Sequence, residues 1–169
     1  MKDNIQDRKE LFNNVKFAML DSGFVKLKEV EHEGDFGFHC GVEFEFFSCI
    51  VFVAIQNDQQ IIKVNLIFFP PVDRDNVAMM EELIGRINSS IMDIGTFLII
   101  PDGVVSLRTD IPIEGEQGLL IEQFRDMLDR LLHHGSTFYR WILITEELGL
   151  SPEQSMMHFA SLNGYEFCK

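Results

Sequence analysis

Residues 61–71 read IIKVNLIFFPP, and this stretch decides the fold class. Ile62, Val64, Leu66 and Phe68 occupy alternate positions, with Lys63 and Asn65 between the first three, which predicts a β-strand. The two prolines end the strand, because proline has no backbone N–H to donate within a sheet. The apolar spacing then changes to that of a helix. The stretch therefore predicts an α+β protein in which helices pack on a sheet.

The segment after the prolines predicts a helix. Asp73 and Asp75 stand where N-caps and first-turn acids are favoured, and Gly95 ends the pattern. The apolar stripe between them comprises Val77, Met80, Leu83, Ile84, Ile87, Ile91 and Ile94.

A β-hairpin is predicted next, over residues 97–100 and 104–113. Pro101-Asp102-Gly103 separates the two stretches, and this is a turn sequence because proline presets φ and glycine accepts a left-handed conformation. The second strand should place Val105, Leu107, Thr109 and Ile111 on one face.

Upstream of residue 61 the pattern predicts a helix and then strands. Apolar residues at helical spacing over 5–19 are followed by the stop Asp21-Ser22-Gly23. A first strand begins at Phe24 and ends before a polar turn at 32–35. One long strand is expected over 36–55, with an interruption near Gly41 as the alternative and with its second half covered on both faces, and residues 57–59 form a hairpin connection.

Downstream of the hairpin the sequence predicts more helix. The stretch from Leu120 to Leu132 is amphipathic, is expected to break at Gly135, and resumes toward Leu148. Ser151-Pro152-Glu153-Gln154 resembles a capping box that starts a short terminal helix. The expected order is α-β-β-β-α-β-β-α, in a single domain over 1–169 with residues 146–169 as a helical C-terminal extension.

Composition restricts the partners. The net charge is −13 and the pI is near 4.7, which disfavours binding to nucleic acid or to anionic membranes. The N-terminus lacks the features of a secretion signal, and Cys40, Cys49 and Cys168 form no metal-type or disulfide-type pattern. We therefore expect a cytoplasmic protein with reduced thiols.

Residues 60–145 resemble the YbjN-like family of bacterial proteins, described as sensory transduction regulators. The resemblance is carried by Arg86-Ile87-Asn88, by Gly95 and Phe97, by Pro101-Asp102-Gly103, and by Val105 to Arg108. It implies the fold of type III secretion chaperones, which are small, acidic, dimeric proteins that hold segments of other proteins. The phenylalanine-rich region before residue 60 and the tail beyond Glu146 depart from the family pattern.

The sequence offers no convincing catalytic or metal site. His39, Cys40 and Cys49 match no zinc-binding spacing. The acidic residues of 29–35 and 43–45 are interpreted as a solvated edge, and His133-His134 as a cap at the end of a helix. No nucleophile or phosphate-binding motif is present. We therefore expect no enzyme, no cofactor and no metal.

An aromatic cluster provides the candidate interface: Phe138, Tyr139, Trp141 and Ile142 lie at helical spacing, which is typical of a core but also of a protein interface. The sequence thus favours a non-catalytic, homodimeric interaction module, chaperone-like or regulatory, that binds a segment of a partner protein. The alternative is a small-ligand sensor or cryptic enzyme with a pocket between sheet and helices.

Overall fold

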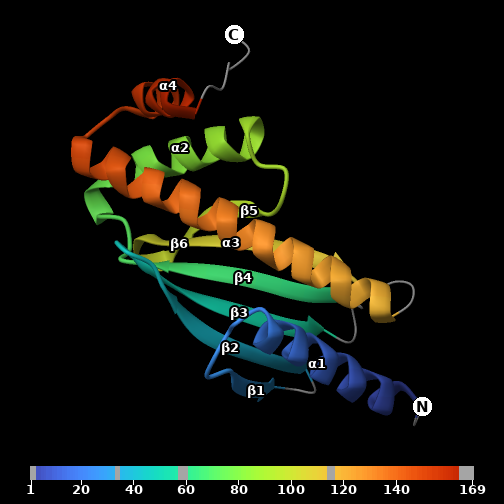
Figure 1. Cartoon of the computed structure of the whole chain (residues 1–169). Coiled ribbons are helices and arrows are strands. Elements are labelled where there is room, and N and C mark those ends of the chain that lie inside the picture. Colours follow the sequence, from blue (N-terminus) through green and yellow to red (C-terminus); the bar gives the residue numbers. More distant parts are fainter. Residues whose placement is uncertain (1–2, 33–34, 57–60, 114–116, 164–169) are drawn as a thin grey trace.

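A six-stranded antiparallel sheet forms the centre of the protein, in the order β1-β2-β3-β4-β6-β5 (Figure 1). The computed structural model describes residues 3–32, 35–56, 61–113 and 117–163. The strands are β1 (Lys28–His32), β2 (Asp35–Glu43), β3 (Ser48–Gln56), β4 (Ile61–Phe69), β5 (Thr96–Ile100) and β6 (Val104–Pro112). This arrangement confirms the predicted α+β class.

In the described part of the chain, four helices accompany the sheet. They are α1 (Asp3–Asp21), α2 (Val77–Ser90), α3 (Gln117–Leu148) and α4 (Pro152–Asn163). Helices α1 and α3 lie side by side across one face of the sheet, α2 lies beside β5, and α4 packs against α2 and α3 (Figure 1). Short 3₁₀ turns occupy Arg74–Asn76 and Pro101–Gly103.

The hydrophobic core lies between the sheet and helices α1 and α3. Burial alternates strictly along β3 and β4, so one face of each strand is buried and the other is half-exposed. Phe68 and Leu66 of β4 point toward α3, where they lie against Gly135. The predicted alternation of residues 62–68 is therefore confirmed.

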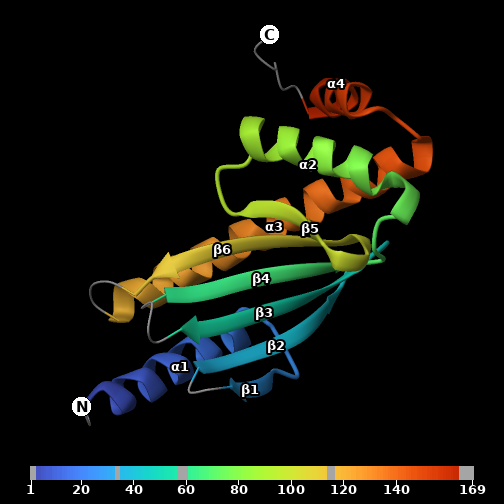
Figure 2. The same cartoon turned by 180° about the vertical axis from the view of Figure 1, so that it is seen from behind.

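Within the described residues, no helix covers the opposite face of the sheet. Figure 2 shows the strands from this side, with α1 and α3 behind them. We had expected the second half of the strand over 36–55 to be covered on both faces, and this is wrong: its apolar residues alternate between the core and the uncovered side.

The predicted long strand is in fact two strands, β2 and β3. The chain reverses between them at residues 44–47, where the Phe44 backbone N–H donates to the Phe47 carbonyl oxygen at 2.8 Å and the two rings stack at 4.6 Å. Phe46 at the tip is exposed and its ring lies 5.1 Å from the Arg140 guanidinium carbon. The turn contains no glycine, proline or asparagine, so the usual sequence signal of a reversal is missing.

Other boundaries shift by a few residues. Strand β1 begins at Lys28 rather than Phe24, since Lys26 has a φ of 59°, which interrupts an extended strand. Helix α2 ends at Ser90 and not at Ile94. The hairpin of β5 and β6 forms as predicted, and the expected turn at 57–59 lies outside the described residues.

Helix α3 is continuous through Gly135, although we had predicted a break there. A Cβ at this position would lie 2.9 Å from the Phe68 ring and 3.0 Å from Leu66. The glycine therefore allows the helix to approach the sheet closely, and does not end it. As a result His133 and His134 lie within the helix, so the helix-end cap predicted for them is wrong.

Candidate interaction site

Strand β1 is an outer strand of the sheet. It has five residues and pairs with β2, from Lys28 opposite His39 to Glu31 opposite Phe36. The other outer strand, β5, lies against α2. Outer strands present unpaired backbone N–H and C=O groups, which a further strand can join.

A groove runs between α1 and β1, with a volume of about 360 Å³. Its lining combines three elements, α1, β1 and β2, and comprises Lys9, Phe12, Asn13, Glu29, Val30, Glu31 and Phe36. We call it the edge groove. Its inner end is aromatic, because the Phe12 ring lies 5.7 Å from that of Phe36 and 5.4 Å from that of Phe38. An ion pair between Lys16 and Glu29 joins α1 to β1 beside it.

Exposed apolar side chains border the edge groove. Val30 of its lining is 40% exposed, and on α1 Phe17 is 63% exposed and Leu20 42%. Phe17 and Leu20 follow Asn13 of the groove at helical spacing, so the three share one side of α1. Large apolar side chains that gather on a surface are typical of a protein-binding site.

The groove is acidic at its outer side. Glu29 and Glu31 both line it, in a chain whose net charge is −13. Lys9 also lines it, and Lys16 is paired with Glu29. This combination of apolar surface, carboxylates and a free strand edge suits an extended segment that carries both apolar and basic residues.

The four residues predicted as an interface are all buried within the chain. Their exposed fractions are 4% for Phe138, 0% for Tyr139, 5% for Trp141 and 0% for Ile142. Tyr139 stacks on Phe68 at 4.6 Å and its hydroxyl donates to the Pro70 carbonyl oxygen. Burial, and secondarily the Glu146 carboxylate, raise the pKa of Tyr139. The structure thus places these four residues in the core, which was the alternative to an interface from the sequence alone.

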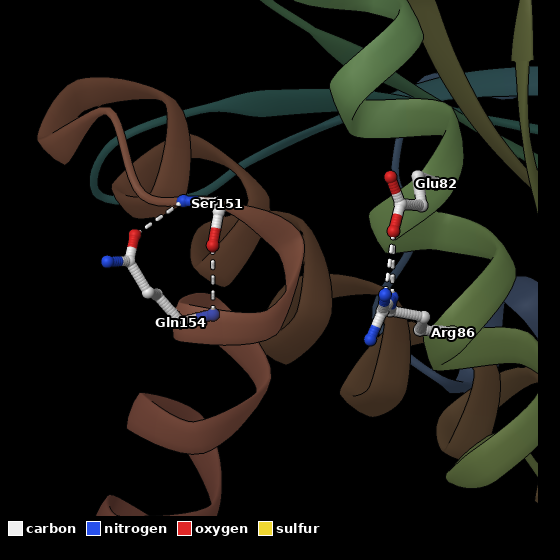
Figure 3. Close-up of polar contacts among 4 residues, drawn as sticks. All are labelled: Glu82, Arg86, Ser151 and Gln154. Atoms are coloured by element: carbon white, nitrogen blue, oxygen red, sulfur yellow. Dashed lines mark hydrogen bonds and ion pairs between the residues drawn. The ribbon is translucent and has the colours of Figure 1, made fainter.

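Helix α4 covers part of this aromatic cluster. The ring of Phe159 stacks on Trp141 at 4.0 Å and lies 5.5 Å from Phe138. The helix starts with the predicted capping box: the Gln154 N–H donates to Ser151 Oγ at 3.2 Å, and the Ser151 N–H donates to Gln154 Oε1 at 2.9 Å. Figure 3 shows this box, together with the Glu82–Arg86 ion pair on α2.

A buried pair of hydroxyl groups also joins α4 to α3. Thr145 Oγ1 donates to the Trp141 carbonyl oxygen at 2.9 Å and lies 2.6 Å from Ser155 Oγ, and both residues are fully buried. We expect Thr145→Val to lower the free energy of unfolding by about 1–2 kcal/mol, because the Ser155 hydroxyl loses a partner without gaining water. Thr145→Val combined with Ser155→Ala should recover most of this loss in urea unfolding. Additive losses in the double variant would contradict the pairing.

The candidate zinc ligands do not converge. Cys40 and Cys49 are buried on the core side of the sheet, whereas His39 alternates with Cys40 and points to the other side. Burial raises the pKa of Cys40 to about 11, and burial together with the nearby Cys40 and Glu43 raises that of Cys49 to about 12. Both thiols are therefore protonated at neutral pH. Within the described ranges, no three His, Cys, Asp or Glu side chains gather closely enough to hold a metal ion.

Two further features bear on the kind of site. A hollow of about 630 Å³ lies on the uncovered face of the sheet, around Phe52, Asn65 and Arg108. It is not the pocket between sheet and helices that the small-ligand alternative requires. None of the helices in the described residues has the length and apolar character needed to cross a membrane.

The edge groove was not predicted from the sequence. One signal was available: Phe17 and Leu20 do not belong to the apolar stripe of the first predicted helix, so they had no core role. The groove itself depends on the pairing of β1 with β2 and on the position of α1, which no local pattern gives.

The sequence model of the YbjN family, with the description "putative bacterial sensory transduction regulator", matches residues 22–143. The match spans β1 to β6, α2 and most of α3, and both α1 and α4 lie outside it. No curated protein and no solved structure matches the chain.

Proposed function

Because the chain belongs to the YbjN family, we propose that it is a non-catalytic regulatory protein that acts by holding an extended segment of another protein in the edge groove. The family description supports the regulatory role. The observation that carries the proposal is the free edge of β1 beside an apolar groove, bordered by the exposed side chains of Phe17 and Leu20.

The segment would bind by adding a strand to β1. In this mode the backbone hydrogen bonds supply affinity, and side chains at alternate positions supply specificity. Glu29 and Glu31 are two residues apart, so they point to the same side of the strand, and Val30 points to the other. A fitting segment carries lysine or arginine at the positions that face the two glutamates and apolar residues between them.

The proposal can be tested with two short synthetic peptides. One alternates leucine with lysine, and the other replaces each lysine with glutamate. We expect the basic peptide to bind more tightly in fluorescence anisotropy, and its affinity to fall as salt is added, because the attraction is screened. Equal binding of the two peptides, or no binding of either, would count against the edge groove.

Variants locate the binding surface. Glu31→Lys should weaken binding of the basic peptide about three- to tenfold, since an exposed charge pair contributes about 0.2–1 kcal/mol and the substitution adds repulsion. Phe17→Ser should also weaken it, through lost apolar contact. Met157→Ser is the matched control, because Met157 on α4 is 65% exposed against 63% for Phe17. Unchanged affinity in both groove variants would place the site elsewhere.

A further inference from the structure

The uncovered face of the sheet is apolar at its centre. Ile50 of β3 pairs with Ile67 of β4, and Ser106 of β6 lies opposite both Ile67 and Leu98 of β5. Ile50, Ile67 and Leu98, with the neighbouring Phe52 and Phe69, form a half-buried apolar block that we call the open face, and Ser106 among them is fully buried. Sheets with one solvated face usually carry polar residues there, so an apolar face indicates that something covers it.

We propose that the open face binds a second copy of this chain, so that two sheets pack face to face about a twofold axis. This proposal concerns a surface different from the edge groove and does not depend on the proposed function. Such packing is the arrangement of β-sandwiches, in which the inner side chains of two sheets interdigitate.

The size of the open face fits a dimer. A strand of nine residues, such as β3 or β4, is about 30 Å long, and six strands spaced about 4.8 Å apart span roughly 25 Å. The whole uncovered side of the sheet, of which the open face is the centre, therefore measures at most about 750 Å², because β1 and β5 have only five residues each. A stable protein–protein interface buries about 800 Å² on each partner.

The charges of this face also favour a second copy. Two chains of net charge −13 repel each other, so they can associate only where the surface is close to neutral. The charged positions on this side of β1–β4 and β6 include three cations and two carboxylates: Lys28, Lys63, Arg108, Glu43 and Asp110. Lys63 lies directly opposite Asp110, so each copy offers both signs to its partner.

The free edge of β1 is less suited to pairing with a second copy of the chain. Antiparallel pairing of two β1 strands about Val30 would place Glu29 of one chain opposite Glu31 of the other. Like charges in directly opposed positions destabilise a sheet. The sheet edge therefore resists a second copy, whereas the open face does not.

The hollow around Phe52 fits an interface with a mixed character. Its lining includes Asn65, Lys63, Arg108 and Asp110, and Asn65 accepts a hydrogen bond from Ser106. Interfaces commonly combine an apolar core with a polar region that retains water. In the dimer, the water-free centre of the interface is formed by Ile50, Ile67, Phe69 and Leu98. The hollow forms the polar region that retains water.

The test is the mass of the full chain in solution, measured by sedimentation at micromolar concentration. We expect twice the chain mass of 19.5 kDa, and tighter association when salt screens the repulsion between the copies. Ile67→Asp should yield the monomer, with circular dichroism confirming the fold. Met157→Asp, on an exposed residue of α4, should leave the dimer intact.

Two outcomes would overturn the proposal: a wild-type chain that stays monomeric at the highest soluble concentration, or an Ile67→Asp chain that dimerises as tightly as wild type. If Ile67→Asp fails to fold, Lys63→Glu provides the second measurement. It adds a negative charge at each copy's open face and should weaken the dimer at low salt. An unaffected dimer in this variant would also count against the open face. Binding of the basic peptide should persist in a folded Ile67→Asp monomer, and Glu31→Lys should remain a dimer, so the two proposals can fail separately.

Discussion

Gly103→Ala is expected to lower the free energy of unfolding by about 2–4 kcal/mol. Gly103 has a φ of 78°, and a Cβ at this position would lie 2.4 Å from the Val72 carbonyl oxygen. The two segments cannot simply separate, because the Val72 N–H donates to the Gly103 carbonyl oxygen at 2.9 Å. The variant therefore combines an unfavourable backbone conformation with a backbone collision. Urea unfolding of the purified chain measures the loss.

Gly23→Ala is the matched control for this prediction. Gly23 also has a positive φ, of 89°, but nothing lies within 4 Å of its Cβ position. Its substitution should show the conformational cost alone, about 1–2 kcal/mol. A loss at Gly103 no greater than that at Gly23 would mean that the contact with Val72 relaxes freely.

Phe68→Ala should be the most destabilising truncation in the sheet, with an expected loss of about 3–5 kcal/mol. Phe68 is fully buried and its ring centroid lies 4.6 Å from that of Tyr139 and 6.2 Å from those of Phe47 and Phe97. It also fills the space beside Gly135, so its removal leaves a cavity between β4 and α3. Thermal or urea unfolding provides the measurement.

Phe17→Ala provides the comparison for Phe68→Ala. Phe17 is 63% exposed, so its truncation should change the free energy of unfolding by no more than about 0.5 kcal/mol. The same variant should weaken peptide binding in the edge groove. A stability loss comparable to that of Phe68→Ala would show that Phe17 has a role in the core.

The sequence predicted those elements whose signals are local. The alternation over 62–68, the helical stripe from Met80 to Ile87, the turn Pro101-Asp102-Gly103 and the Ser151–Gln154 box all correspond to structure. Each of these signals arises from backbone geometry or from one buried face, so it is visible in a short window.

The errors occurred where tertiary packing overrides a local preference. The reversal at residues 44–47 is held by stacked phenylalanine rings rather than by turn-forming residues. Gly135 lies within a continuous helix, and its lack of a side chain leaves room for Phe68 and Leu66 of the sheet. The site was harder still to predict. Trp141 is a residue type common in interfaces, but Phe159 of α4 covers it. The edge groove forms only when α1 and β1 come together.

The order of strands has a consequence during synthesis on the ribosome. Strands β1 to β4 pair with their neighbours in sequence, so this four-stranded part can form once residue 69 has emerged. Its buried face, however, requires α3, which begins at Gln117. At roughly 5–20 residues translated per second, the intervening stretch takes several seconds. For that interval Leu66 and Phe68, which lie against Gly135 of α3 in the folded protein, are exposed in the nascent chain, and aggregation is then most favoured.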